Sequence, residues 1–590
     1  MNRQYMSLTK IRSGRGRGSR AGLPFLLLLL LVSAMCSAAC GAKKKPVDPS
    51  VIGGPRGLVV SSHPAATQAG SEVLRRGGNA IDAGVATGLA LGVVDQFNSG
   101  IGGGGFLLLH LTSGKVVAID GRERAPAAAS RGMYITEGGY DPRLSRVGPR
   151  AVGVPGILAA YEEALKLGGS RSLAELIQPA IDLAEQGFVL DPYALSRYRN
   201  AIEELRRDTA SARIYFRPDG SPLEEGDLFR QPDLAETYRR IAREGSDYFY
   251  RGEFARRLAS YMAEKGGLIT LADMQRYRTV ARQPVVGTYR GYRVFGMPPP
   301  SSGGVHVVQI LNLLEVSGIL VGKSDWDQEA ILWTSSFMSR AFEDRAAHLG
   351  DSDYYPVPVK RLISKAYAEE IMAGLTKPGA TGSDARDAAL PDEGHTTSYV
   401  VLDRDRNVVV VNQTVNLNFG AKVTLPGTGV LLNNQMDDFS AQPGEPNAFG
   451  LVGSEANAIE PGKRPLSSMS PTIVLRGSRP VMALGGAGGP AIITAVLQVV
   501  VNVLDFKMDL VEAISVPRFH HQYLPDALIV EQGSPLAGQH KEGIAGQGIL
   551  VRDHIGVVNA IAWSEREKAY VGVSDPRARA SRVRLREGGP

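Results

Sequence analysis

The sequence predicts a large protein that mixes α-helices with β-strands, and three observations lead to this expectation. The chain has 590 residues, so its length is compatible with several domains or with one large assembly. Helical and strand periodicities are mixed along the chain, and the pattern becomes rich in strands after residue 395. Many of the 69 glycines stand in short clusters, which indicates tight turns near a site rather than a flexible linker.

The first forty residues have the order of a targeting segment. A basic stretch is followed by a leucine run over residues 26–31, which is too short to span a bilayer comfortably and has the flanks of a signal peptide. Residues 37–40, Ser-Ala-Ala-Cys, resemble a bacterial lipobox, with Cys40 as the lipidated residue and Cys36 as a second candidate. An ordinary signal peptide with incidental cysteines is the alternative. We expect a signal peptide over 1–39 and an exported protein of the periplasm or cell envelope, anchored to a membrane through Cys40.

The positive net charge belongs to this targeting segment. The formal charge is +6, and no acidic residue precedes Asp48. The chain from Cys40 onward is formally neutral, and a nucleic-acid-binding protein would need a basic domain. We therefore expect no nucleic-acid partner. The basic residues ahead of Cys40 are Arg3, Lys10, Arg12, Arg15, Arg17 and Arg20.

Cysteine and histidine usage excludes several kinds of site. Cys36 and Cys40 are the only cysteines, so the body of the protein has no internal disulfide, thiol nucleophile or cysteine-ligated metal. The nine histidines show no H-E-x-x-H spacing, and the adjacent pair His520-His521 would point to opposite faces of a strand. We expect neither a metal nor another cofactor.

The elements expected before residue 374 are mostly helices with one clear hairpin. Residues 40–56, with three consecutive lysines followed by proline and glycine, are expected to form a tether. Strands over 106–111 and 115–120 form a hairpin around Thr112-Ser113-Gly114. Apolar residues at helical spacing predict helices over 70–76, 80–94, 154–167, 172–186, 192–207, 305–316 and 327–348.

Residues 374–395 interrupt this pattern. They are polar and rich in turn residues, which predicts an exposed, mobile segment. Two strand-rich runs follow at 396–402 and 408–415. Further along, a hairpin joins 471–475 to 481–484, and an apolar helix is expected over 491–506.

The junction of this segment with the strand that starts at Thr396 suits an N-terminal nucleophile. A threonine hydroxyl is a poor nucleophile without a base. If the bond after His395 is cut, the new α-amino group of Thr396 lies within reach of its own hydroxyl. Such an amine has a pKa of about 7.7–8.0 in model peptides, so it can accept the hydroxyl proton near neutral pH. This fits a chain without a recognisable Ser-His-Asp motif.

The expected register of the hairpin supports the same centre. If Leu402 pairs with Val408, antiparallel pairing places Thr414 opposite Thr396, although a slip by one residue remains open. Thr414 and Asn416 share a strand face, so the first could bond the nucleophile and the second could reach a substrate. Taken alone, these residues also fit ordinary threonines of a strand.

A series of motifs occurs in order between residues 57 and 577. They are His63-Pro64-Ala65-Ala66, Gly77-Gly78-Asn79-Ala80-Ile81-Asp82-Ala83, Ser99-Gly100-Ile101-Gly102-Gly103-Gly104-Gly105-Phe106, Arg122-Glu123-Arg124-Ala125-Pro126, Pro298-Pro299-Pro300-Ser301-Ser302-Gly303-Gly304, Thr396-Thr397, Leu431-Leu432-Asn433-Asn434-Gln435-Met436-Asp437-Asp438-Phe439, Lys463-Arg464-Pro465-Leu466-Ser467-Ser468-Met469-Ser470-Pro471 and Ser574-Asp575-Pro576-Arg577. In this combination the chain resembles the γ-glutamyltransferase (γ-glutamyltranspeptidase) family.

The resemblance implies an α+β fold, the four-layer αββα sandwich of N-terminal nucleophile hydrolases. It implies a precursor cut between His395 and Thr396 into a large subunit, 57–395, and a small catalytic subunit, 396–590, which stay together as a heterodimer. The implied activity is that of a γ-glutamyltransferase and glutathione hydrolase. Such an enzyme cleaves γ-glutamyl amides such as glutathione and passes the γ-glutamyl group to water, amino acids or peptides.

The resemblance also assigns catalytic roles to individual residues. Thr396 matches the self-processing nucleophile, and Thr414 matches the threonine that positions it. Gly488 and Gly489 match the glycines whose backbone N–H groups form the oxyanion hole, where small residues allow close approach.

A second group of matched residues surrounds the glutamyl head group. Arg122 matches the arginine that grips the α-carboxylate, because its planar guanidinium can bind a carboxylate through two hydrogen bonds. Asp438 carries the charge that an α-ammonium group requires. The other matched residues are Ser467 and Ser468 at the carboxylate, and Asn416 and Gln435 around the amino end. Without the resemblance, Arg122 could equally be a surface cation and Asp438 a helix cap.

The sequence departs from the family pattern at the glycine loop, residues 487–490. Ala487 replaces a frequent proline, and Pro490 replaces a frequent serine or threonine. Because proline suits the start of a helix, we expect the loop to keep its form. Residues 95–98, Asp-Gln-Phe-Asn, replace a more usual acidic-proline stretch and put only the local loop shape in doubt.

Two rival functions remain open at this point. A cephalosporin (glutaryl) acylase shares the fold, but the segment 440–457 resembles the lid loop of γ-glutamyl enzymes, and its presence favours a γ-glutamyl substrate. A lipid-anchored protein that binds glutamyl compounds and never cleaves itself is the non-catalytic alternative. The preferred acceptor, and the balance of hydrolysis and transfer, cannot be predicted from the sequence.

Overall fold

The computed structural model describes residues 51–375, 377–378, 395–539, 548–578 and 581–586. The expected signal peptide, Cys36 and Cys40 lie outside the described residues. So does most of the expected mobile segment, 374–395, although its last residue, His395, is described and buried. Within the described part of the chain, no helix combines the length and the apolar composition that crossing a bilayer requires.

The first of two large sheets has the expected nucleophile strand as an inner strand, the third of seven. Two adjacent strands that follow residue 395 lie between strands that precede it, so the sheet contains strands from both sides of the expected cut. In spatial order the strands are β1 (Val51–Gly54), β2 (Gly57–Val60), β12 (Thr396–Asp403), β13 (Val408–Thr414), β3 (Gly104–His110), β4 (Val116–Gly121) and β9 (Val280–Arg282).

The second sheet is also antiparallel and also draws on both sides of the expected cut. Its first two strands precede residue 395 and its other five follow it. In spatial order they are β10 (Val285–Tyr289), β11 (Tyr292–Gly296), β14 (Thr472–Arg476), β15 (Arg479–Ala487), β19 (Val557–Ser564), β20 (Ala569–Ser574) and β21 (Ser581–Arg586).

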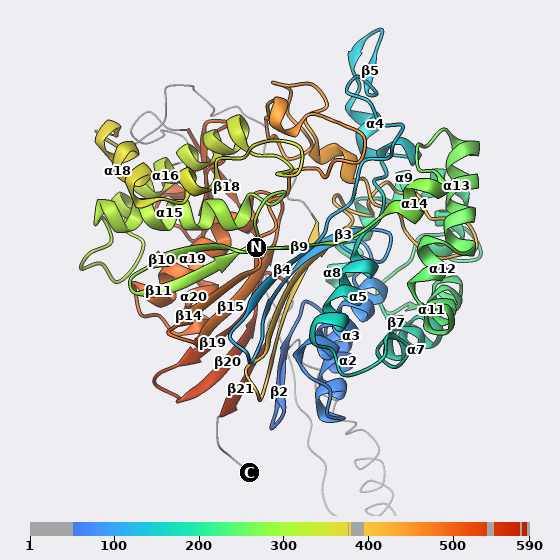
Figure 1. Ribbon diagram of the computed structural model, residues 1–590, viewed down its shortest axis with the longest axis horizontal. Coiled ribbons are helices and arrows are strands. Elements are labelled where there is room, and N and C mark those ends of the chain that lie inside the picture. The colour runs from blue at the N-terminus through green and yellow to red at the C-terminus, as the bar shows by residue number, and fades with distance from the viewer. Residues whose placement is uncertain (1–50, 376, 379–394, 540–547, 579–580, 587–590) are drawn as a thin grey trace, which may run out of the picture. The chain divides into compact units, whose positions relative to one another are not determined.

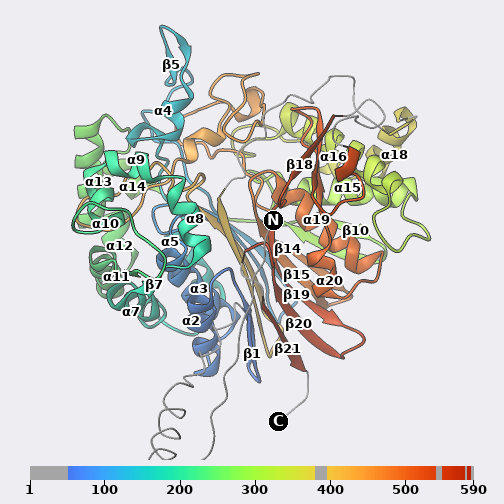
Figure 2. The same cartoon turned by 180° about the vertical axis from the view of Figure 1, so that it is seen from behind.

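Helices cover the outer face of each sheet, and the sheets pack against each other, as Figures 1 and 2 show. This confirms the predicted four-layer αββα sandwich. Over the first sheet lie α2 (Pro64–Arg75), α3 (Ala80–Val94), α5 (Ile157–Gly168), α7 (Gln178–Gln186), α11 (Pro232–Glu244), α12 (Ser246–Tyr250) and α13 (Glu253–Lys265). Over the second lie α15 (Gly303–Ser317), α16 (Gln328–His348), α18 (Lys365–Gly374), α19 (Ala491–Leu504) and α20 (Leu510–Ser515).

Strand β12 is buried on both faces because it lies inside this sandwich. Side chains alternate along a strand, so Val400 and Leu402 join the core between the sheets. Tyr399 and Val401 join the core under the helices. The nucleophile candidate at the start of this strand is therefore held by two cores at once.

Most expected elements are present, with shifted ends. The helix expected at 70–76 begins earlier, at Pro64, where proline occupies the first turn. The helix at 80–94 has the predicted bounds, since Asn79 and Asp82 form a capping box. The helix expected over 172–186 is wrong as one element: it divides into α6 (Leu173–Leu176) and α7, because Pro179 cannot continue a hydrogen-bonded helix.

Two further expectations are corrected. The helix over 192–207 divides into α8 (Pro192–Arg199) and α9 (Ile202–Arg207), and Ala201 between them lies outside helical geometry. The tether over 40–56 is wrong for its last residues. Val51–Gly54 form the edge strand β1, which pairs with β2 from Val51↔Val60 to Gly54↔Gly57. The two-residue turn Pro55-Arg56 reverses the chain, so β1 and β2 form a hairpin.

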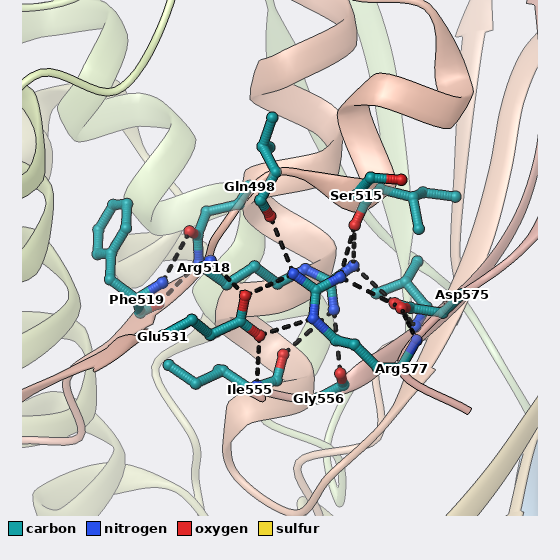
Figure 3. Close-up of polar contacts among 12 residues, drawn as sticks. Gln498, Ser515, Arg518, Phe519, Glu531, Ile555, Gly556, Asp575 and Arg577 are labelled. Atoms are coloured by element: carbon teal, nitrogen blue, oxygen red, sulfur yellow. Dashed lines mark hydrogen bonds and ion pairs between the residues drawn. The ribbon is translucent and has the colours of Figure 1, made fainter. Parts of the chain in front are cut away.

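A buried ionic cluster ties the helix and strand ends of the small-subunit region together (Figure 3). Arg518 donates from Nη2 to Asp575 Oδ2 over 2.7 Å, and from Nη1 to the carbonyls of Ile555 and Gly556 over 3.1 and 3.0 Å. Arg577 donates to the carboxylate of Glu531, which also accepts from the Ile555 backbone. A Cβ on Gly556 would lie 3.2 Å from the carbonyl oxygen of Ala487, so the cluster supports the glycine loop from behind.

Candidate active site

Thr396 is the first residue of β12, and its pairing is the one expected. Thr396 lies opposite Thr414, and Leu402 lies opposite Val408, which confirms the predicted register and excludes the slip by one residue. Thr396 is 8% exposed, and Thr414 is 2% exposed. The pair therefore lies inside the sandwich and not on a strand surface.

Hydrogen bonds connect Thr396, Thr414 and His395. Thr396 Oγ1 donates to Thr414 Oγ1 over 3.3 Å. Thr414 Oγ1 donates in turn to the carbonyl oxygen of His395 over 2.7 Å, and it accepts from the backbone N–H of Asn416 over 2.9 Å. One hydroxyl therefore touches both the candidate nucleophile and the carbonyl of the bond expected to be cut. Burial lowers the pKa of the His395 imidazole well below its usual range, so this side chain is neutral at physiological pH.

Glycines allow the chain to approach this pair closely. A Cβ on Gly103 would lie 2.0 Å from the carbonyl oxygen of Thr414, and one on Gly102 would lie 2.0 Å from that of Leu431. Any larger residue would push β13 away. The glycine run of residues 102–105 is therefore a packing requirement of the strand that carries Thr414.

A cavity opens beside Thr396 and collects residues from distant parts of the sequence. We call it the first cavity. Among the residues that line it are nine of the predicted site residues: Arg122, Thr396, Thr414, Asn416, Gln435, Asp438, Ser467, Ser468 and Gly489.

Arg122 and Asp438 both line the first cavity and bond each other directly. Arg122 stands just after β4, is 1% exposed, and donates from Nη2 to Asp438 Oδ2. Its Nε donates to the carbonyl of Pro465 over 3.1 Å. Gln435 Nε2 donates to the same Asp438 oxygen over 2.7 Å. The structure therefore excludes the alternatives in which Arg122 is a surface cation and Asp438 caps a helix.

The other predicted head-group residues lie around this pair. The expectation that Asn416 shares a strand face with Thr414 is wrong, because β13 ends at Thr414 and Asn416 has a left-handed backbone, with φ of 80°. Its Nδ2 donates to the carbonyl of Asn434 over 3.1 Å. Ser467 Oγ accepts from the backbone N–H of Met469 over 3.1 Å. Ser468 Oγ accepts from Arg345 Nη2 over 3.4 Å. All three are held by the protein before any ligand binds.

The glycine loop reaches Thr396 from the second sheet. Gly485 and Gly486 belong to β15, so only Gly488 and Gly489 form the turn before α19. Their φ angles, 125° and 57°, favour glycine. Pro490 precedes the first residue of α19, as expected. Among the described residues, neither glycine amide has a hydrogen-bond acceptor.

Gly488 and His395 line a second cavity on the other side of Thr396. Thr396 therefore stands between two cavities: Gly489 belongs to the first and Gly488 to the second. The segment 440–457 contributes to the wall of the first cavity. Its Phe449 and Leu451 line that cavity, and Asn457 Nδ2 donates to the carbonyl of Asp438 over 2.7 Å.

Two charged residues of this site were not singled out in the sequence. Arg345 on α16 lines the first cavity, and Glu123 lies beside Arg122, with 3.7 Å between Glu123 Oε2 and Arg122 Nη1. Burial raises the pKa of the Glu123 carboxyl to about 8 despite the attraction of Arg122. Within the described residues, no group of three or more histidine, cysteine, aspartate or glutamate side chains could hold a metal ion.

A buried threonine at the start of a central strand, inside a two-sheet sandwich covered by helices, defines the class of N-terminal nucleophile hydrolases. Comparisons narrow this class. The family model described as gamma-glutamyltranspeptidase matches residues 66–584. The glutathione hydrolase proenzyme of Escherichia coli (strain K12) is 40% identical over 575 residues, covering 94% of this chain and 98% of the relative.

Relatives with acylase names are also similar. The acylase ACY 1 proenzyme of Pseudomonas sp. (strain SE83) is 39% identical over 540 residues, covering 88% of this chain and 91% of that protein. The crystal structure of a cephalosporin acylase from Bacillus halodurans superposes with a TM-score of 0.76 at 27% identity, covering 92% and 98% of the two chains. With the family model matching most of its length, the chain belongs to the γ-glutamyltranspeptidase family.

Proposed function

We propose that the protein is a γ-glutamyltransferase and glutathione hydrolase that makes its own nucleophile by cutting between His395 and Thr396. The observation that carries this proposal is the place of Thr396. Thr396 is hydrogen-bonded to Thr414, which donates to the carbonyl of the bond to be cut. Thr396 also lines the cavity in which Arg122 and Asp438 are paired. The E. coli relative is named a glutathione hydrolase proenzyme, which is consistent with a cut precursor that acts on glutathione.

The first stage is the self-cleavage. Thr396 Oγ1 attacks the His395 carbonyl carbon, the C–N bond breaks, and the hydroxyl proton passes to the Thr396 nitrogen. Thr414, which already donates to that carbonyl oxygen, stabilises the negative charge that develops there. Water then hydrolyses the ester. The products are a carboxylate on His395 and a free α-amino group on Thr396.

The second stage uses the new amine as the base. It takes the Thr396 hydroxyl proton while the oxygen attacks the γ-carbonyl of the substrate. The backbone N–H groups of Gly488 and Gly489 stabilise the oxyanion, and the amine product leaves with the proton. Water or an amino acceptor then attacks the γ-glutamyl ester and restores the hydroxyl.

Binding of the substrate head group follows from charge. In the structure Arg122 and Asp438 neutralise each other across the first cavity. A γ-glutamyl group carries one carboxylate and one ammonium, so it can enter between them and give each a new partner. Gln435 and Asn416 lie at the ammonium side, and Ser467 and Ser468 lie at the carboxylate side.

A comparison of two substrates tests this function against the acylase alternative. Glutaryl para-nitroanilide lacks only the α-amino group of γ-glutamyl para-nitroanilide. We expect the γ-glutamyl compound to have the higher kcat/KM, because Asp438 would otherwise remain without a cationic partner from the ligand. A clear preference for the glutaryl compound would favour the acylase. Glutathione hydrolysis and glycylglycine acceptance, measured beside it, give the balance of hydrolysis and transfer.

We also propose that Cys40 anchors the protein to a membrane of the cell envelope. The support is the sequence of residues 37–40, Ser-Ala-Ala-Cys, after the apolar run. In a bacterial host the wild type should fractionate with membranes and incorporate labelled fatty acid. Cys40→Ser should lose both properties while Cys36→Ser keeps them. The reverse result would move the anchor to Cys36.

A further inference from the structure

Arg345 is a buried cation with no carboxylate partner in the described structure. It belongs to α16, is 6% exposed, and lines the first cavity. Its neighbour on the same helix, Asp344, accepts from Gln309 and Tyr367 instead. Burying a guanidinium without a counter-ion is costly, and here burial lowers the pKa of Arg345 to about 10. Attraction by Asp438 raises this pKa again, but Asp438 is bonded to Arg122, so an anion from outside the protein would stabilise Arg345 further.

The hydrogen bonds of Arg345 lead to both serines of the predicted carboxylate site. Its Nη2 donates to Ser468 Oγ over 3.4 Å, and its Nε donates to Ser302 Oγ over 3.2 Å. Ser302 Oγ donates onward to the carbonyl of Ser467 over 2.8 Å. One guanidinium thus holds the hydroxyl of Ser468 directly and, through Ser302, contributes to holding the backbone of Ser467.

These bonds also determine how the Ser468 hydroxyl is oriented. A guanidinium can only donate, so Ser468 Oγ must accept from Arg345 and keeps its own hydrogen for another group. Among the described residues this hydrogen has no acceptor, and Ser468 lines the first cavity. The hydroxyl is therefore prepared to donate to an anion placed there.

The charges around the first cavity also favour the binding of an anion. Arg122 and Arg345 supply two positive charges, and Asp438 supplies one negative charge. Asp438 is already bonded to Arg122. The side of the cavity near Ser468 thus has an excess of positive charge that a substrate carboxylate would neutralise.

We propose that Arg345 is a positioning residue for the α-carboxylate of the γ-glutamyl donor, holding Ser467 and Ser468 in place and supplying the charge that the Arg122–Asp438 pair does not provide. The inference rests on the proposed function, because it assigns a residue to the same donor site. Arg345 acts through the serines, so its loss should weaken donor binding more than it slows the chemical step.

The test compares Arg345→Gln with Arg345→Lys and with the control Arg340→Gln. Arg340 lies on the same helix, is partly exposed, bonds Glu343, Asp344 and Tyr367, and does not line the cavity, so its loss controls for damage to the helix itself. The two substrates are γ-glutamyl para-nitroanilide and γ-aminobutyryl para-nitroanilide, which lacks only the α-carboxylate. Where turnover of the second is slow, competition by L-glutamate and by γ-aminobutyrate gives the same comparison.

We expect Arg345→Gln to raise KM for the γ-glutamyl substrate by about 10- to 100-fold, since hydrogen bonds to charged groups have that strength. Its kcat should change much less, and the constants for the aminobutyryl compound should stay the same. Arg345→Lys should recover part of the loss, and Arg340→Gln should behave as wild type. Ser302→Ala removes the hydroxyl that links Arg345 Nε to the carbonyl of Ser467, but that carbonyl keeps its bond from the Ser302 backbone N–H, so the rise in the same KM should be smaller.

Two results would overturn the inference. One is an unchanged γ-glutamyl KM in fully cut Arg345→Gln. The other is an equal loss for both substrates, which would indicate general damage to the fold. If Arg345→Gln remains uncut, the KM values of Arg345→Lys and Ser302→Ala decide in the same way. An inactive wild type would instead contradict the proposed function itself.

Discussion

Thr414 lies between the nucleophile and the carbonyl of the bond that we expect to be cut. Its hydroxyl accepts from Thr396 and donates to His395. The same side chain therefore orients the attacking oxygen and withdraws charge from the carbonyl. Neither contact needs a titrating group, which agrees with the neutral state of the buried His395.

Replacing Thr414 should slow self-cleavage. Thr414→Ala removes the donor to the His395 carbonyl, and loss of one oxyanion donor typically costs about 100- to 1,000-fold in rate. Thr414→Ser keeps the hydroxyl and should cleave at nearly the wild-type rate. Denaturing gels of freshly expressed protein, sampled over time, measure both. Cleavage of Thr414→Ala at the wild-type rate would show that this hydroxyl has no part in the step.

Glu123 should make the free energy of unfolding depend on pH. Burial raises its pKa from the usual 4.5 to about 8, so the folded protein keeps a proton that the unfolded chain releases. The protonated carboxyl therefore stabilises the fold fully below pH 4.5, and this stabilisation is lost as the pH rises toward 8. Glu123→Gln cannot release a proton.

We predict that the wild type loses more thermal stability between about pH 5 and pH 8 than Glu123→Gln does. The measurement is the unfolding midpoint of both proteins at the two pH values. Glu137→Gln, a change at an exposed glutamate, is the control and should follow the wild type. Parallel pH curves for wild type and Glu123→Gln would contradict the buried, protonated state.

At the scale of elements, the ionic cluster of Figure 3 fixes the strand ends behind the glycine loop. Arg518 and Asp575 are both fully buried and bond each other, and Arg518 also holds the Ile555 and Gly556 carbonyls. Removing one member leaves a buried charge without its partner.

We predict that Arg518→Met lowers the free energy of unfolding by about 3 kcal/mol, because the buried Asp575 loses its closer cation and keeps the longer ion pair with Arg577 and two backbone donors. The displaced Gly556 should also disturb the glycine loop and reduce turnover. Arg566→Met changes an exposed arginine whose ion pairs are with Asp509 and Glu567, and it should change stability by less than about 0.5 kcal/mol. Denaturant unfolding compares the two, and equal effects would refute the role of the cluster.

Much of the site could be predicted because its signals are local. Residues 396–402 and 408–415 are two β-rich runs with a short connection, and pairing Leu402 with Val408 gave the observed register from Thr396 to Thr414. Pro490 indicated the start of α19. Arg345 and Glu123 could not be predicted, because a charged residue on a helix of mixed polarity, or just after a strand, gives no sign of burial. Their environment comes from segments such as 435–438 and 467–468, far away in the chain.

The misread elements have physical reasons as well. Val51–Gly54 is too short and too close to a polar stretch to give a strand pattern, and it gains its hydrogen bonds only by pairing with β2. The interrupted helices had continuous apolar spacing, but Pro179 removed a backbone donor from one of them.

For the whole molecule, the expected cut does not fall between separable bodies. In the first sheet β12 and β13 lie between β2 and β3, and in the second β14 pairs with β11. Separating the two pieces would break both sheets and expose both cores. Cleavage would therefore break one peptide bond and leave the two fragments in one fold.

We predict that the two fragments elute together from a sizing column in native buffer, with the mass of the whole chain, and unfold in one transition. They should separate only in strong denaturant, since both cores contain residues from each fragment. Elution of the 396–590 fragment by itself in native buffer would be incompatible with the interleaved sheets.

The most direct test of the central claim is the intact mass and N-terminal sequence of the purified protein beside Thr396→Ala. We predict two fragments for the wild type, the smaller beginning Thr-Thr-Ser-Tyr, and one whole chain for the variant. A wild-type chain that stays whole under native conditions, or one that begins its second fragment elsewhere, would contradict Thr396 as a self-generated nucleophile.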